Sequence, residues 1–499
     1  MMKKFVLIMA ALALLAPTAA LAAEFSLGGF IKLSTFWDST QEGVAVGRAA
    51  VIQRNNDAGF QHGNFHMTSQ ESRYNFTIKG PELWGAKTTA FIEMDFAGSY
   101  DSNVSGVTGA AGPNSISNAY QMRLRHAMFR LNWPETELLF GQYWGMFAEF
   151  TPEAAGFLEF STKGAASYRA PQIRLTQKFL GDWTVAAAIM EPYSPGTADA
   201  NFNTTAIGFP AGSSGTTYLA GGAIFPGGRN AETPKFEGKI AYERDLWGKA
   251  AYFGRPRGFT AQLTAAWERI QYRTNAPGAS LLNTFGQNAF GATSVVQDGQ
   301  QYLSPWAVGA SLFVPVIPTY SANLAGTASI TTQWFIGQGT TFIDGSRDND
   351  NSWFQFIGRS PSGAFIYDRK LMNQFGGFVQ GQYYFTSQWY MNAAWGMRRD
   401  YGIDTSTSAL LAGQQAGNLP GYKYASNNDQ LKLWQQFDLT LWYRPIQALR
   451  FGLQYAYQRA DFLQKTNNPT IAGGAVQNSQ GATNVGESHR LQFVAFMYF

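Results

Sequence analysis

Cysteine is absent from this chain of 499 residues. Its absence excludes a fold cross-linked by disulfides, metal sites with cysteine ligands and cysteine-attached haem. Histidine is scarce as well, with four copies. His62 and His66 have a spacing that a metal could use, but they lie at a loop–strand junction without a third ligand, so a solvated pair is expected. We therefore expect neither a metal site nor a cofactor.

Charged residues and long apolar runs are also scarce. Asp, Glu, Lys and Arg make up 14% of the chain, whereas soluble domains have about 25%. Beyond residues 1–22, no stretch approaches the ~18 unbroken apolar residues that a transmembrane helix needs. The formal net charge of +4 carries no nucleic-acid-binding signature, so no nucleic-acid partner is expected.

Residues 1–22 have the pattern of a secretory signal peptide. Two lysines precede an apolar stretch, which ends in an Ala-Leu-Ala cleavage site. Removal of this segment, which carries Lys3 and Lys4, would lower the formal net charge from +4 to +2. The remaining residues, 23–499, are expected to form a single domain.

Aromatic residues and glycine are abundant, and polar and apolar residues alternate along most of the chain. In 73–78, for example, Tyr, Phe and Ile alternate with Arg, Asn and Thr. A period of two with one apolar face is typical of a strand that is wet on one side. Strands of this kind that close into a barrel can satisfy all their backbone hydrogen bonds inside a membrane.

The pattern predicts an all-β fold, a transmembrane antiparallel up-and-down β-barrel of about 16 strands. Short connections with Pro, Gly or Asp alternate with long polar ones, as is usual in outer-membrane barrels. The connection 244–258 is irregular, and a strand pair there would raise the number to about 18. The predicted strands are 25–37, 65–79, 86–97, 119–131, 137–145, 168–179, 183–190, 235–243, 258–272, 306–315, 328–336, 374–386, 389–399, 430–444, 450–460 and 487–499.

The last predicted strand has a regular alternation up to its final residue. We expect Leu491, Phe493, Ala495, Met497 and Phe499 to face lipid. Arg490, Gln492 and Val494 would then face inward, and the strand would pair with the first one to leave no open edge. By the same reasoning, His126 falls on the outward side of strand 119–131 with Leu124 and Met128, where a buried subunit contact is expected.

Several segments resemble the trimeric outer-membrane porins of Gram-negative bacteria. The resemblance rests on SRYNF (72–76), RLRHA (123–127), GQYWGMF (141–147), YRAPQIR (168–174) and the terminal FMYF. It extends to the homotrimeric porins of sulfate- and iron-reducing bacteria and to the related dicarboxylate-type porins. It implies a third extracellular loop, here residues 146–167, that folds inward and narrows the pore. The terminal Phe499 is similar to the signal read by the barrel assembly machinery.

The charges around this loop are the candidate pore constriction. Loop carboxylates facing a wall of cations would set up a field across the pore and thereby set its ion preference. The alternative is that these charges form an ordinary solvated strand face. The acidic candidates on the loop are Glu149, Glu153 and Glu159, and the basic candidates on the wall are Lys32, Arg73, Arg123, Arg125 and Arg174.

The expected function is passive diffusion of small hydrophilic solutes through an outer-membrane channel. Alternatives are a selective channel for small organic anions of the dicarboxylate type and, less favoured, a barrel that displays loops for adhesion or partner binding. No G-x-S-x-G elbow occurs, so no enzyme is expected. The expected partners are outer-membrane lipid and lipopolysaccharide, the assembly machinery, small hydrophilic solutes, and further copies of the chain in a homotrimer.

Overall fold

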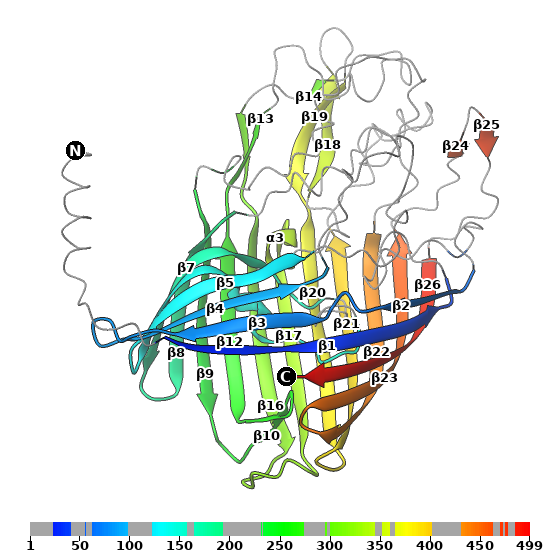
Figure 1. Ribbon diagram of the computed structural model, residues 1–499. Coiled ribbons are helices and arrows are strands. Elements are labelled where there is room, and N and C mark those ends of the chain that lie inside the picture. Colours follow the sequence, from blue (N-terminus) through cyan, green and yellow to red (C-terminus); the bar gives the residue numbers. More distant parts are fainter. Residues whose placement is uncertain are drawn as a thin grey trace, which may run out of the picture.

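The main sheet of the protein closes on itself. It contains seventeen strands, and β26 (Val485–Tyr498) pairs with β1 (Glu24–Asp38). β2 (Asn64–Thr68) and β3 (Arg73–Lys79) pair with the two halves of β1 and therefore share one stave. The result is a closed antiparallel barrel of sixteen staves (Figure 1). The computed structural model describes residues 23–40, 55, 62–97, 122–156, 164–192, 231, 233–273, 295–296, 300–344, 352–359, 365–401, 431–462, 470–472, 475–477 and 485–499.

The sixteen predicted strands correspond one to one to these staves, although two of them differ in extent or continuity from the prediction. The predicted strand 65–79 is broken between β2 and β3, and 258–272 leaves the barrel after Trp267. The other staves are β4 (Lys87–Asp95), β5 (Arg123–Asn132), β6 (Thr136–Trp144), β7 (Arg169–Phe179), β8 (Trp183–Met190), β9 (Lys235–Arg244), β12 (Phe259–Trp267), β16 (Trp306–Ile317), β17 (Ala328–Gln338), β20 (Asn373–Tyr384), β21 (Trp389–Tyr401), β22 (Leu431–Ile446) and β23 (Leu449–Phe462).

Smaller elements lie in the connections. The irregular segment 244–258 does contain a strand pair, but it forms its own two-stranded sheet, so the barrel has sixteen staves and not eighteen. Within the described ranges, no helix is long and apolar enough to cross a membrane. The smaller elements are η1 (Met146–Glu149), α3 (Thr341–Asp344), the pair β10 (Ala250–Tyr252) and β11 (Arg255–Arg257), the pair β13 (Ile270–Arg273) and β15 (Gln300–Leu303), the sheet of β14 (Val295–Val296), β18 (Ser352–Arg359) and β19 (Phe365–Leu371), and the pair β24 (Thr470–Ala472) and β25 (Ala475–Gln477).

Short and long connections lie at opposite rims of the barrel. The turns 180–182, 385–388 and 447–448 join neighbouring staves at the lower rim in Figure 1. The strand ends that are joined by long connections, such as those of β1 and β2 and those of β8 and β9, lie at the upper rim. This is the division into short and long connections that the sequence predicted, and it is the one that outer-membrane barrels have.

Side chains alternate between the two faces of the wall, as β26 illustrates. Leu491, Phe493 and Met497 are 51%, 42% and 54% exposed on the outer face. Arg490 and Gln492 are 5% and 1% exposed on the inner face. The predicted orientation of the last strand is therefore confirmed. Its pairing with β1 is confirmed too, since the two strands are in register from Phe30↔Tyr498 to Asp38↔Arg490.

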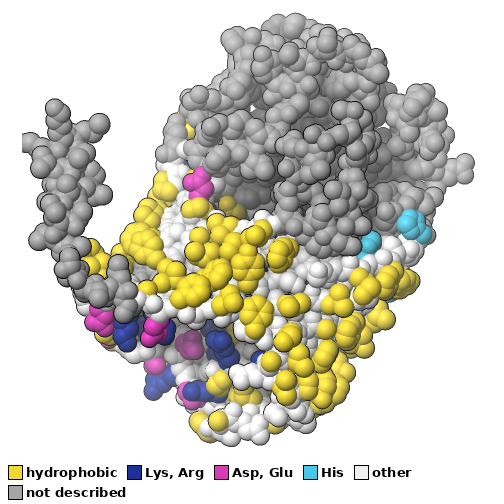
Figure 2. Space-filling model, viewed as in Figure 1, with side chains coloured by type: hydrophobic (Ala, Val, Ile, Leu, Met, Phe, Trp, Pro, Cys, Tyr) yellow, Lys and Arg dark blue, Asp and Glu magenta, His cyan; other side chains and the backbone are white. Residues whose placement is uncertain are grey.

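The distribution of polarity is the reverse of that in a soluble protein. Figure 2 shows hydrophobic side chains over most of the outer face of the staves that it displays. The inward positions carry mainly Gln, Ser, Thr and charged residues, for example Gln262, Thr264, Ser311 and Gln454, all of them buried. A wall that is apolar outside and polar inside encloses a lumen suited to water.

An arginine on the outer face should destabilise the barrel in a depth-dependent way. Leu312 faces outward near the middle of β16, and Ile317 is exposed at the end of the same strand. We expect Leu312→Arg to lower the free energy of unfolding by about 2–4 kcal/mol and Ile317→Arg by about 0–1 kcal/mol. Denaturant unfolding of the protein in lipid bilayers measures both. Equal losses would contradict the assignment of this face to lipid.

Candidate functional site

The third long connection, residues 145–168 between β6 and β7, is termed L3 here. Its first part is held by side chains on two other staves, β9 and β17. The backbone N–H of Met146 donates to Glu237 Oε2 on β9 (2.7 Å). Gln333 on β17 donates from Nε2 to the carbonyl of Phe147 (2.5 Å) and accepts at Oε1 from the N–H of Ala166 (3.1 Å). Gln333 thus ties the outgoing and returning segments of L3 to the same point of the wall.

The middle of L3 is anchored by the carboxylate of Glu153. Arg450 Nη2 on β23 lies 2.5 Å from Glu153 Oε1, and both side chains are largely buried, at 13% and 2% exposed. Tyr390 donates its hydroxyl to the same oxygen (2.9 Å), and Gln382 donates to Oε2. Asn392 donates to the Glu153 carbonyl (2.7 Å). A buried carboxylate with this many donors is fixed in one position.

Beyond Glu153, L3 reaches the strands that close the barrel. The N–H of Ala155 donates to Gln454 Oε1 on β23 (2.5 Å). Its carbonyl accepts from Gln492 Nε2 on β26 (3.0 Å) and from Lys32 Nζ on β1 (3.2 Å). L3 therefore extends through the lumen from β9 to β1 along the inner wall. The predicted inward path of residues 146–167 is observed at 146–156 and 164–167.

One glycine is required for the return of L3. Gly164 has φ +84°, and a Cβ atom there would lie 2.3 Å from the carbonyl oxygens of both Gly377 on β20 and Met397 on β21. A side chain at this position would collide with backbone that cannot move without disturbing the wall. Gly164 thus lets the main chain of L3 lie directly against two staves.

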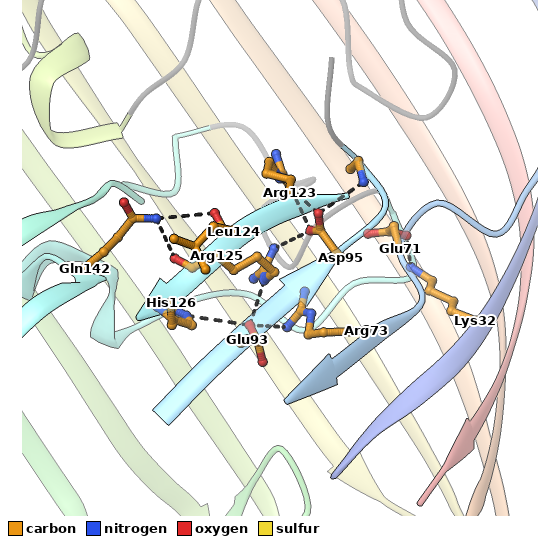
Figure 3. A network of polar contacts seen from close by, with 11 residues as sticks. Lys32, Glu71, Arg73, Glu93, Asp95, Arg123, Leu124, Arg125, His126 and Gln142 are labelled. Atoms are coloured by element: carbon orange, nitrogen blue, oxygen red, sulfur yellow. Dashed lines mark hydrogen bonds and ion pairs between the residues drawn. The ribbon is translucent and has the colours of Figure 1, made fainter. Parts of the chain in front are cut away.

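On β1, β3, β4, β5 and the link between β2 and β3, seven charged residues form what we term the wall cluster, and one of them, Lys32, also binds L3. Arg123 forms two hydrogen bonds with Asp95, Nε–Oδ1 at 3.0 Å and Nη2–Oδ2 at 2.6 Å (Figure 3). Arg125 bridges Glu93 (Nε–Oε1 2.7 Å) and Asp95 (Nη1–Oδ2 3.0 Å). The paired guanidinium and carboxylate groups order this side of the lumen. The wall cluster comprises Lys32, Glu71, Arg73, Glu93, Asp95, Arg123 and Arg125.

Exposure separates the arginines of the wall cluster. The side chain of Arg125 is 1% exposed and that of Arg73 is 10% exposed, whereas that of Arg123 is 23% exposed. Four cations and three carboxylates leave the cluster with one net positive charge. Arg123 is therefore the guanidinium of the cluster that is best placed to meet a solute, and Arg125 cross-links the wall behind it.

The orientation predicted for His126 is wrong. The pairing of β4 with β5 has a β-bulge at which Glu93 lies opposite His126 and Met94 opposite Leu124. The extra residue reverses the alternation, so Arg125 and His126 are both buried. The ring centroid of His126 lies 4.7 Å from that of Tyr143 in a tilted arrangement, and its Nε2 lies 3.7 Å from Glu93 Oε1. It is thus buried within a single chain, and no subunit contact is needed to explain it.

The remaining predicted site residues have other partners. Glu149 of L3 pairs with Lys239 on β9. Arg174 lies 3.8 Å from Glu137 and donates to the carbonyl of Trp144 (3.4 Å). Glu159 lies outside the described residues.

The described carboxylates of L3, Glu149 and Glu153, thus pair with Lys239 and Arg450. The sequence analysis did not select Lys239 or Arg450 as partners of L3, nor Glu93 and Asp95 as partners of the wall arginines. For Glu93 and Asp95 the sequence did contain a signal, because they are two residues apart on the polar side of the strand next to Arg123 and Arg125.

Comparisons with known proteins support the barrel. No protein-family model matches the chain, and no curated protein sequence matches it significantly. Among solved structures, the outer membrane channel DcaP of Acinetobacter baumannii has a TM-score of 0.54 at 17% identity, over 96% of this chain and 97% of that one. OmpF of Salmonella typhi has a TM-score of 0.46 at 10% identity, over 95% of this chain and 97% of that one. OmpT of Vibrio cholerae has a TM-score of 0.45 at 11% identity, over 96% of this chain and 98% of that one. The similarity to DcaP shows a shared fold.

Removing Arg125 should cost more stability than removing Arg123. Arg125→Gln removes a fully buried guanidinium that bridges two carboxylates and leaves Glu93 with the more distant Arg73 and Asp95 with Arg123, so we expect the free energy of unfolding to fall by about 3 kcal/mol. Arg123→Gln leaves Asp95 paired with Arg125, and we expect a loss of about 1 kcal/mol. Denaturant unfolding in detergent micelles compares the two variants. A larger loss for Arg123→Gln would overturn the division of roles between these arginines.

Proposed function

We propose that this protein is an outer-membrane channel of a Gram-negative bacterium, through which small hydrophilic solutes and ions diffuse passively. The observation that carries the proposal is the position of L3. A sixteen-stave barrel encloses a lumen too wide to discriminate between small solutes. L3 reduces that lumen, and its contacts with β9, β17, β23 and β26 hold it in place.

The charges along the remaining path favour anions. Arg123 offers a partly exposed guanidinium, and the wall cluster has one net positive charge. The two described carboxylates of L3, Glu149 and Glu153, are neutralised by Lys239 and Arg450 and so oppose this charge only weakly. A solute carboxylate passing Arg123 could accept hydrogen bonds from it. These features support the narrower alternative of a channel selective for small organic anions.

Targeting and assembly follow from the same proposal. Residues 1–22 would direct export and be removed, leaving 23–499 as the pore domain. The apolar outer face supports contact with outer-membrane lipid, with lipopolysaccharide in the outer leaflet. The resemblance of the sequence segments to trimeric porins supports a homotrimer. The alternating strand that ends at Phe499 supports recognition by the barrel assembly machinery.

Reconstitution in planar bilayers tests the channel directly. We expect stepwise ohmic openings, grouped in threes if the protein is a trimer. Current that falls in a concentration-dependent way when a dicarboxylate is added would support the anion-selective alternative. Membranes that stay silent after verified insertion of folded protein would contradict the proposal.

Ion selectivity should depend on Arg123. In a salt gradient, we expect Arg123→Gln to shift the reversal potential toward cation selectivity, because the wall cluster then loses its net positive charge. Arg130→Gln is the matched control. It lies on the same strand with a similar side-chain exposure (24%), but it belongs to a pair with Glu137 near the short-turn rim. Equal shifts for the two variants would show that Arg123 has no special place in the path.

A further inference from the structure

The connection between β9 and β12 differs from the other short connections. It contains the β10–β11 hairpin, in which Ala250 pairs with Arg257 and Tyr252 with Arg255. The two residues at its tip, Phe253 (φ +50°) and Gly254 (φ +75°), are both left-handed, which is the geometry of a tight two-residue hairpin turn. The channel mechanism described above makes no use of this hairpin.

The hairpin packs against the inner surface of the barrel. Lys249, just before β10, exchanges two backbone hydrogen bonds of 2.8 Å with Thr319 in the β16–β17 turn. Ser329 on β17 faces inward and donates its hydroxyl to the carbonyl of Ala251 (3.0 Å). Ala250 and Ala251 are fully buried. These contacts place β10 inside the lumen and not below the rim.

Tyr252 connects the hairpin to L3. Its hydroxyl donates to the carbonyl of Glu149 (3.2 Å) and accepts from the N–H of Thr151 (3.3 Å). Burial raises the pKa of the Tyr252 phenol above its ordinary value, so the hydroxyl keeps the proton that it donates. Between these two L3 residues, Phe150 is fully buried in a cluster with Ala250 of the hairpin.

Aromatic and cationic contacts extend this junction. The guanidinium of Arg257 lies 4.7 Å from the ring of Phe150 and 5.1 Å from that of Tyr252. Ala251 belongs to another buried cluster that includes Ala155 of L3. The hairpin therefore shares one buried cluster with L3 around Phe150 and a second one around Ala155.

The tip of the hairpin reaches the far wall. A Cβ atom on Gly254 would lie 3.5 Å from Arg444 Nη1 and 3.9 Å from the hydroxyl of Tyr384. Arg444 belongs to β22, which is five staves away from β12 in the order of the sheet. Tyr384 stacks on Tyr390 at 4.4 Å, and Tyr390 donates to Glu153. The hairpin thus ends beside the residues that anchor the middle of L3.

We propose that the β10–β11 hairpin is a second constriction element of the channel. It enters the lumen from the rim opposite L3, supports L3 through Tyr252, Ala250 and Ala251, and occupies cross-section that would otherwise conduct. The width of the pore is then set by two insertions that meet inside the barrel. This inference rests on the proposed channel function for its effect on current, but the support of L3 by the hairpin is independent of it.

The support of L3 can be measured without any current, because the chain contains no cysteine. Thr151→Cys places one thiol at a buried position of L3 that contacts Tyr252. Adding Tyr252→Phe removes two hydrogen bonds to L3. We then expect a water-soluble maleimide to label the folded protein about tenfold faster, which corresponds to a decrease of about 1.4 kcal/mol in the free energy of exposing the thiol. The matched control is Tyr320→Phe, an exposed tyrosine in the β16–β17 turn. Equal labelling rates in the three proteins would overturn the proposal.

Bilayer currents test the effect on the pore. When residues 250–257 are replaced by two glycines, we expect the single-channel conductance to rise by roughly twofold, because open cross-section sets an ohmic current. Tyr252→Phe, which keeps the hairpin, should increase open-channel noise with little change in mean conductance. Unchanged conductance and noise in both variants would overturn the constriction role. A silent wild-type protein would instead contradict the channel function, and the labelling experiment would then still decide whether the hairpin supports L3.

Discussion

The ion pair between Glu153 and Arg450 is the interaction on which the interior of the barrel depends. An unpaired carboxylate buried in this position would cost several kcal/mol. The pairing with Arg450 therefore keeps this part of L3 against β23. Tyr390 and Gln382 complete the set of donors and remove alternative positions for the carboxylate. A flexible loop thereby becomes a fixed part of the wall, as a constriction with a defined size requires.

Two different uses of charge follow from this arrangement. Arg450 and Lys239 neutralise Glu153 and Glu149 of L3 and hold the loop against one side of the lumen. In the wall cluster, Arg125 is buried between two carboxylates, and this places Arg123 at the edge of the open path. The charges in these described pairs thus fix structure, and in the proposed channel the partly exposed Arg123 would influence selectivity. The hairpin adds apolar support at Phe150, next to the ion pair of Glu149 with Lys239.

The sequence predicted the staves well because each of them is read with the same simple period. One face meets lipid and the other meets water, so strands such as 487–499 can be placed from alternation alone. The inward path of L3 between β6 and β7 was predicted on a different ground, the resemblance of the flanking segments to trimeric porins. Three features could not be predicted from alternation, each for its own reason. The bulge at Arg125 and His126 reverses an orientation without leaving a mark in the composition. Ion pairs such as Glu153 with Arg450 join positions far apart in the chain, and the hairpin at 250–257 is too short to give a periodic signal.

The central claim is that L3 occupies this position while the channel conducts. In the cysteine-free chain, Ala155→Cys and Val494→Cys place thiols on two residues of one buried cluster, the first on L3 and the second on β26. A short bifunctional thiol reagent should join them in the bilayer, and the single-channel conductance should stay at its value before cross-linking. Failure to cross-link, or a conductance that falls when the bridge forms, would show that L3 lies elsewhere in the open channel.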